Sequence, residues 1–279
     1  MKKIVFLCNW GESPLELLDR YSRQTPNEFG IWKNLQGVAN IGDADYYIVL
    51  EGYSGELPLD NTIYVKREPK FIRDFHAPYK NIIDWSETNC GITWWINKTY
   101  DELKSMPYPK KTKKISCVVS SKHEHRDTYV KSLFTHNSPI DLYGKGHDRS
   151  YYGDHYKGAL DYDGKCKLAG LIDYEYSIVL ENSQQKNYFT EKLADAFLSW
   201  SKPLYWGCPN LSKLFPTDSF TAIELGTQNP ATLIAETVSK PINIEALNVA
   251  RNLILDRFNI WEIIYRKING DNHAVLQPI

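Results

Sequence analysis

Short apolar runs alternate with helix-like stretches along the chain, and this alternation constrains the fold more than any other feature. Ile4–Cys8 is an uninterrupted apolar run, as in strands that are covered on both faces. Ser13 and Pro14 follow as a good N-cap and a good first residue of a helix. Strand-like runs recur at residues 46–50 and 62–66, so the first hundred residues predict an α/β domain.

A second alternation follows residues 106–114, a segment with two prolines and four lysines that is typical of a linker. We therefore place an N-terminal Rossmann-like domain at residues 1–108 and a C-terminal one at residues 109–279. The strand-like runs of the second domain are residues 115–119, 140–143, 176–180 and 203–206, and its helices are expected at 126–134, after Thr190, at 244–257 and at 259–267.

Composition excludes several classes of protein. The 279 residues contain 33 Lys+Arg and 34 Asp+Glu, and this balance excludes a generic binder of nucleic acid, which needs surplus positive charge. The five cysteines form no C-x-x-C pair, which indicates a reducing compartment. No apolar run approaches the roughly 20 residues of a transmembrane helix. We expect a cytoplasmic protein without a transmembrane segment, while peripheral contact with the inner face of a membrane stays open.

The segment most informative about chemistry joins a strand to a helix at residues 180–193. Asn182 and Ser183 offer neutral hydrogen bonds, Glu191 can accept from two sugar hydroxyls, and Lys192 places a positive charge in the first helical turn. Ligands bind at such strand ends in open α/β sheets, and helix N-termini suit phosphate oxygens. The pattern predicts a cradle for a sugar nucleotide, with simple helix capping as the alternative.

The chain contains the run Y-S-I-V-L-E-N-S-x-x-x-x-Y-F-T-E-K-L-x-x-A-F, followed by K-P-L-Y-W-G-C-P. This run resembles the signature of glycosyltransferase family 10, the α-1,3/α-1,4-fucosyltransferases, and above all their soluble bacterial members. The resemblance implies a GT-B architecture, in which two Rossmann-like domains face each other across a cleft. It also implies that the C-terminal domain binds GDP-fucose and the N-terminal domain the glycan acceptor. Carried over by position, the donor-binding residues are Arg126 and Lys192 at the pyrophosphate, Asn182, Tyr188 and Glu191 at the nucleotide and its ribose, and Glu181 and Ser183 in the same segment.

The resemblance further implies an inverting reaction, which needs a base for the acceptor hydroxyl. Glu68 is our candidate, because it stands just after a strand of the N-terminal domain, in front of a proline. Arg67 departs from the family pattern, and pairing with Glu68 would lower the pKa of this carboxyl and weaken the base. Glu12 and Glu51 are the fallback candidates.

The family implies neutralisation of phosphate by protein cations, so no metal is expected to be obligatory, and a divalent ion would at most stimulate. His123 and His125 alternate as a metal pair could, but no third ligand is evident and a solvated loop is favoured. The expected acceptor is N-acetylglucosamine in a lactosamine-like glycan, linked α-1,3 or α-1,4. Three alternatives stay open: another GDP-deoxysugar donor such as GDP-perosamine or GDP-colitose, a non-catalytic carbohydrate-binding protein, and an unrelated α/β nucleotide-binding protein.

Overall fold

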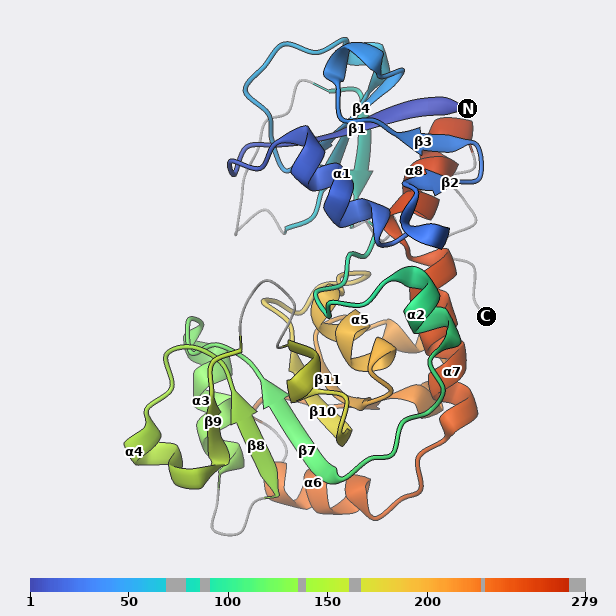
Figure 1. Cartoon of the computed structure of the whole chain (residues 1–279). Helices are drawn as coiled ribbons and strands as arrows, with labels where there is room; N and C mark the ends of the chain where they lie inside the picture. The colour runs from blue at the N-terminus through green and yellow to red at the C-terminus, as the bar shows by residue number, and fades with distance from the viewer. Residues whose placement is uncertain (69–78, 86–90, 135–138, 161–166, 227–228, 271–279) are drawn as a thin grey trace. The chain divides into compact units, whose positions relative to one another are not determined.

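The computed structural model describes residues 1–68, 79–85, 91–134, 139–160, 167–226 and 229–270 (Figure 1). Contacts divide the chain into two compact units, which we describe separately. Among the described residues, unit 1 contains Met1–Thr93, Lys98–Ser105 and residues 255–270, and unit 2 contains Trp94–Asn97 and Met106–Ile254. The predicted boundary between residues 108 and 109 differs from this division chiefly at the end of the chain, since the last described helix packs with unit 1.

In the described part of unit 1, six strands form one sheet in the order β2-β3-β1-β4-β5-β6. Only the short β2 runs antiparallel to its neighbour. The parallel strands alone follow the flavodoxin-like order 2-1-3-4-5, which reverses between β1 and β4. The strands are β1 (Lys2–Cys8), β2 (Ile31–Trp32), β3 (Leu35–Gly37), β4 (Tyr46–Leu50), β5 (Thr62–Lys66) and β6 (Asn81–Asp84).

The predicted burial of β1 on both faces is confirmed. Phe6 stacks on Tyr21 with a distance of 4.4 Å between ring centroids. Val5 and Leu7, which point to the other face, join a separate buried cluster with Val49. A strand in this position needs an apolar side chain at every residue, which explains the continuous run in the sequence.

Helix α1 (Pro14–Ser22) begins where its capping residues predict. The Ser13 hydroxyl accepts a hydrogen bond from the Glu16 amide at 3.3 Å, and the Glu16 carboxylate accepts one from the Ser13 amide at 2.7 Å. This capping box satisfies two amides that have no partner within the helix. The helix thereby starts at a fixed point after β1 and directs Tyr21 onto the sheet.

The end of the chain contributes α8 (Ile260–Asn269) to unit 1, where it lies alongside β2 and β3 (Figure 1). Asn259 caps this helix by accepting from the Trp261 amide at 3.0 Å. Trp261 is fully buried, and its indole N–H donates to the Tyr21 carbonyl at 2.9 Å. The short α2 (Tyr100–Ser105) also belongs to unit 1.

In the described part of unit 2, six strands form a sheet in the order β12-β11-β10-β7-β8-β9, with all neighbours parallel. Numbered within the unit, this is the Rossmann order 3-2-1-4-5-6, which reverses between β7 and β10. The strands are β7 (Lys113–Val118), β8 (Ile140–Tyr143), β9 (Tyr156–Gly158), β10 (Tyr174–Leu180), β11 (Lys202–Trp206) and β12 (Thr221–Ala222).

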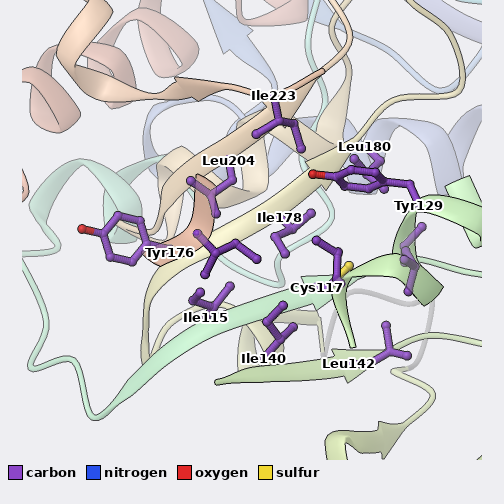
Figure 2. Packing of buried hydrophobic residues seen from close by; sticks show 14 of the residues in the cluster. Ile115, Cys117, Tyr129, Ile140, Leu142, Tyr176, Ile178, Leu180, Leu204 and Ile223 are labelled. Atoms are coloured by element: carbon purple, nitrogen blue, oxygen red, sulfur yellow. The ribbon is translucent and has the colours of Figure 1, made fainter. Parts of the chain in front are cut away.

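Figure 2 shows the core of unit 2, in which apolar side chains from neighbouring strands pack together. Cys117 of β7 lies fully buried beside Ile178 of β10, and Tyr129 reaches this layer from a helix. Cys117 is thus a small core residue, and it is a free cysteine. The helices of unit 2 are α3 (Glu124–Leu133), α4 (Arg149–Tyr152), α5 (Glu191–Leu198), α6 (Pro230–Val238) and α7 (Ile244–Asn252).

The helix predicted at residues 244–257 is interrupted. Helix α7 ends at Asn252, and Leu253–Arg257 continues as a π-helical turn. The passage from unit 2 to unit 1 falls inside this turn. Within the described ranges, no helix is long and apolar enough to cross a bilayer.

Candidate active site

The turn after β10 is closed by a buried carboxylate. Glu181 is 0% exposed and accepts hydrogen bonds from the Thr190 amide at 2.9 Å and from the Thr190 hydroxyl at 2.7 Å. Thr190 is at the same time the N-cap of α5, where its hydroxyl accepts from the Lys192 amide at 3.3 Å. These bonds fix the start of α5 against the carboxyl end of β10.

Lys192 lies between two carboxylates at this helix start. Its ammonium is 3.1 Å from the Glu191 carboxylate and 3.6 Å from that of Glu181. Burial opposes the ammonium charge, but these two carboxylates outweigh it and raise the pKa of Lys192. Burial also opposes the charge of Glu191, yet Lys192 and Lys167 hold the pKa of Glu191 down at about 2. Lys192 is therefore a cation at neutral pH.

Arg126 brings a second cation from α3, which follows β7. The side chain is 4% exposed and donates to the Asn182 side-chain oxygen at 3.0 Å and to the Leu180 carbonyl at 3.4 Å. Its Nε has no hydrogen-bond partner among the described residues. The charge of Arg126 counteracts the rise in the pKa of Lys192, so the two cations are close enough to interact. Both stand at the switch point between β7 and β10, where a Rossmann sheet opens to its ligand.

His123 is close enough to these cations for their charges to act on it, which the sequence did not predict. It precedes α3 as its N-cap residue and makes no side-chain capping bond. Burial lowers the pKa of His123, and the charges of Arg126 and Lys192 lower it further. The only signal in the sequence was its position between a strand and Arg126. No group of three metal-ligating side chains occurs within the described ranges.

The other predicted donor-binding residues differ in exposure. Asn182 is partly exposed and bonded to Arg126. Ser183 is buried, and its hydroxyl has no hydrogen-bond partner in the described part of the chain. Tyr188 is 1% exposed, so the structure places its ring in the core rather than on a surface that a nucleotide could touch. Glu181, equally buried, acts on Thr190 and Lys192.

A second set of hydrogen bonds, between Asn187 and Asn210, fixes the loop between β10 and α5. Asn187 adopts a left-handed backbone conformation, with φ of 65°. Its amide donates to the Asn210 side-chain oxygen at 2.8 Å, and the Asn210 amide group donates back to the Asn187 side chain at 2.8 Å. Asparagine is one of the few non-glycine residues that tolerates this backbone region, which explains its use here.

The candidate base and its two fallbacks lie at one edge of unit 1. Glu68 is partly exposed and follows the carboxyl end of β5. Glu12 is engaged by the Arg20 guanidinium and by the Trp10 indole N–H. Glu51 is buried after β4. Arg67 donates to the Tyr21 hydroxyl at 3.4 Å and lies over the Trp10 ring.

Similarity to solved structures defines the fold. AviGT4, a glycosyltransferase involved in avilamycin A biosynthesis, aligns with 99% of this chain and 98% of its own at a TM-score of 0.57 and 11% identity. The DNA-modifying enzyme β-glucosyltransferase aligns with 96% of this chain and 99% of its own at a TM-score of 0.50 and 13% identity. The chain has the fold of a GT-B glycosyltransferase, as predicted.

The sequence comparisons relate the C-terminal part of the chain to one family. Residues 108–236 match the model of the glycosyltransferase family 10 (fucosyltransferase) C-terminal region. The α-(1,3)-fucosyltransferase FucT of Helicobacter pylori is 37% identical over 71 residues, which are 25% of this chain and 15% of that protein. A GDP-fucose protein O-fucosyltransferase 3 of Danio rerio is 28% identical over 40% of this chain and 24% of its own length. The alignments thus span a quarter or less of these relatives.

Proposed function

We propose that the chain is a fucosyltransferase that transfers L-fucose from GDP-fucose to a hydroxyl of a glycan. One observation carries the proposal: Arg126, bonded to Asn182, and Lys192, paired with Glu191, both stand where the strand order of a Rossmann sheet reverses, inside the stretch that matches family 10. Two interacting cations, one with an unpartnered and buried N–H, suit a diphosphate. The names of the relatives support fucose as the sugar.

The cations would stabilise the leaving group. As the bond between C1 of fucose and the phosphate oxygen breaks, that oxygen gains negative charge. The planar Arg126 fork can hold two oxygens, and Lys192 adds a point charge. We therefore propose that no metal is obligatory for the departure of GDP and that a divalent ion would at most stimulate. Addition of EDTA is expected to leave most of the activity, and complete loss that Mg²⁺ restores would contradict this part.

Glu68 would act on the acceptor as general base. The acceptor oxygen attacks C1 from the face opposite to GDP, its proton passes to the Glu68 carboxylate, and the configuration at C1 inverts from β to α. A positioned base contributes roughly 10²–10⁴-fold to the rate. N-acetylglucosamine in a lactosamine-like glycan, linked α-1,3 or α-1,4, is the acceptor we propose. A cytoplasmic location, with peripheral contact at the inner membrane face, completes the proposal.

Nucleotide binding tests the donor site. GDP that binds only the native state at about 100 times its Kd stabilises the protein by about 2.7 kcal/mol and raises Tm. We expect a shift with GDP and a much smaller one with UDP. A shift from UDP alone would overturn the assignment of GDP.

Transfer tests the base. Wild-type protein with GDP-fucose and N-acetyllactosamine should yield a fucosylated product by mass spectrometry. Glu68→Gln should reduce transfer by roughly 10²-fold or more and leave the Kd for GDP unchanged. Normal turnover by this variant would remove Glu68 from the proposal. A parallel reaction with GDP-perosamine or GDP-colitose shows whether another donor is preferred.

A further inference from the structure

Glu51 differs from an ordinary loop glutamate in its burial and in its backbone conformation. It follows β4 at the point where the strand order of unit 1 reverses, and it is 3% exposed. Its backbone is left-handed, with φ of 60°, a region that non-glycine residues rarely adopt. Its carbonyl accepts from the Tyr64 hydroxyl at 3.0 Å, and its amide donates to the Val65 carbonyl at 3.2 Å. The residue is thus tied to β5 by its main chain.

The side chain of Glu51 makes a second connection to the same neighbour. Its Oε1 accepts hydrogen bonds from two successive amides, those of Arg67 and Glu68, the latter at 2.8 Å. Both amides lie just beyond the end of β5, which pairs with β4 up to Leu50 and Val65. One carboxylate oxygen therefore holds the peptide segment on which the candidate base stands.

The free-energy cost of burying the Glu51 carboxylate indicates that its hydrogen bonds to the two amides serve a specific purpose. Burial of a carboxylate is costly unless hydrogen bonds replace its water. Burial raises the pKa of Glu51, while the Arg67 amide and the Arg67 charge act against the rise. The Glu68 charge raises the same pKa, so the two carboxylates are close enough to interact. A neutral and smaller residue would avoid these costs but would not reach both amides.

We propose that Glu51 is a positioning residue that fixes the Arg67–Glu68 backbone and thereby aims the Glu68 carboxylate at the acceptor hydroxyl. The inference rests on the proposed function of Glu68. Glu51 itself does not serve as the base, because a group that is 3% exposed cannot meet an acceptor, and its Oε1 already accepts two hydrogen bonds.

Two substitutions separate a positioning role from a basic one. Glu51→Gln keeps the length of the side chain and an oxygen that accepts both amides, but it removes the charge. Glu51→Asp keeps the carboxylate but is one methylene shorter. Positioning predicts that Glu51→Gln retains kcat within about threefold, whereas Glu51→Asp lowers kcat by up to about 10²-fold because the base moves. In both variants the KM for GDP-fucose and the Kd for GDP should be unchanged, because the cations of the donor site belong to unit 2.

Glu56→Gln is the matched control, since this exposed glutamate lies in the same loop. It should leave kcat unchanged. The opposite order, an active Glu51→Asp and an inactive Glu51→Gln, would overturn the inference and make Glu51 the base. Equal activity of all variants would also overturn it. If Glu51→Asp unfolds, a loss of kcat in a folded Glu51→Gln would still overturn the inference. A wild-type protein that binds GDP but transfers no fucose would instead contradict the proposed function.

Discussion

Lys192 has its charge stabilised by Glu181 and Glu191, and yet it stays partly accessible at the start of α5. A diphosphate that approaches it adds a third anionic partner. Charge-assisted hydrogen bonds of this kind contribute about 1.5–3 kcal/mol each. On this magnitude we propose that Lys192 is a binding residue as well as a structural one.

Lys192→Ala should therefore weaken GDP binding by about 10- to 100-fold, since each 1.4 kcal/mol is tenfold in Kd. Titration calorimetry with GDP measures the change. Lys110→Ala is the control, because Lys110 is exposed in the segment before β7. An unchanged Kd in Lys192→Ala would exclude the lysine from the diphosphate site.

His123 should make donor binding dependent on pH. Burial and the neighbouring Arg126 hold the pKa of His123 below its ordinary 6.5, so the imidazole is neutral at pH 7. A bound diphosphate favours the imidazolium and raises that pKa again. Binding then takes up a proton, and affinity for GDP-fucose should increase as the pH falls from about 7.5 to about 6.

Titration calorimetry in buffers of different ionisation enthalpy measures how many protons are taken up on binding. GDP-fucose is the suitable ligand, because its diphosphate is esterified at both ends and does not titrate in this range. His123→Gln should abolish the uptake. His125→Gln should preserve the proton uptake, since the His125 ring packs on Trp206, with 5.4 Å between the ring centroids. Uptake that persists in the first variant and vanishes in the second would reassign the proton.

The positions of the two cations could be predicted from the sequence. Arg126 and Lys192 follow β7 and β10, and parallel strands bring their carboxyl ends to the same edge. The burial of Tyr188 could not be predicted, because the path of the loop from residue 181 to 190 depends on the braces at Glu181 and Asn187. The left-handed backbone of Glu51 was equally hidden, since no periodicity in the sequence signals such a residue.

At the scale of elements, the start of α5 is the feature on which the proposed donor site depends. Thr190 connects three parts of it: the helix amide of Lys192, the buried Glu181 carboxylate and the end of the loop. Loss of an N-cap costs typically about 1 kcal/mol. Here the cap also holds Glu181, which in turn faces the Lys192 ammonium.

Thr190→Ala should lower the free energy of unfolding by about 1–2 kcal/mol and also weaken GDP binding. Urea denaturation and calorimetry measure the two effects. Ser13→Ala removes the corresponding cap of α1 in unit 1, so it should cost similar stability without a change in the Kd for GDP. Thr190→Ser, which restores the hydroxyl, should recover both properties. Weakening of GDP binding by Ser13→Ala to the same extent would show a general loss of stability instead.

The elements predicted best are those with a strong local signal. β4 and β5 coincide with their apolar runs, and α1 and α5 begin at their caps. β2 and β12 have only two residues each, too few for a periodic pattern, and the sequence analysis missed them. The π-helical turn after Asn252 was also missed, because its helical pattern continues without a break.

At the scale of the whole molecule, the chain leaves unit 1, forms unit 2 and returns to unit 1. This return could not be predicted from the sequence, since an apolar helix face does not reveal its partner. Unit 1 thus depends on both ends of the chain, whereas the residues of the proposed donor site belong to unit 2. Damage to the core of each unit should consequently affect different properties.

Trp261→Ala tests this division. The indole is fully buried, donates to the Tyr21 carbonyl and lies edge-on to Phe6 at 5.3 Å between ring centroids. Truncation of such a residue costs about 3–5 kcal/mol, a large share of the stability of a domain. We expect loss of transfer and a lower unfolding temperature for unit 1, while the Kd for GDP stays within about twofold of the wild-type value.

Phe197→Ala is the reciprocal variant, because Phe197 is a fully buried residue of α5 and packs on Phe215 in unit 2. It should weaken GDP binding, and unit 1 should keep its unfolding temperature. Hydrogen exchange followed by mass spectrometry assigns each loss of protection to its unit. If Trp261→Ala abolishes GDP binding as completely as Phe197→Ala does, the two units unfold together, and the donor site then depends on the return of the chain to unit 1.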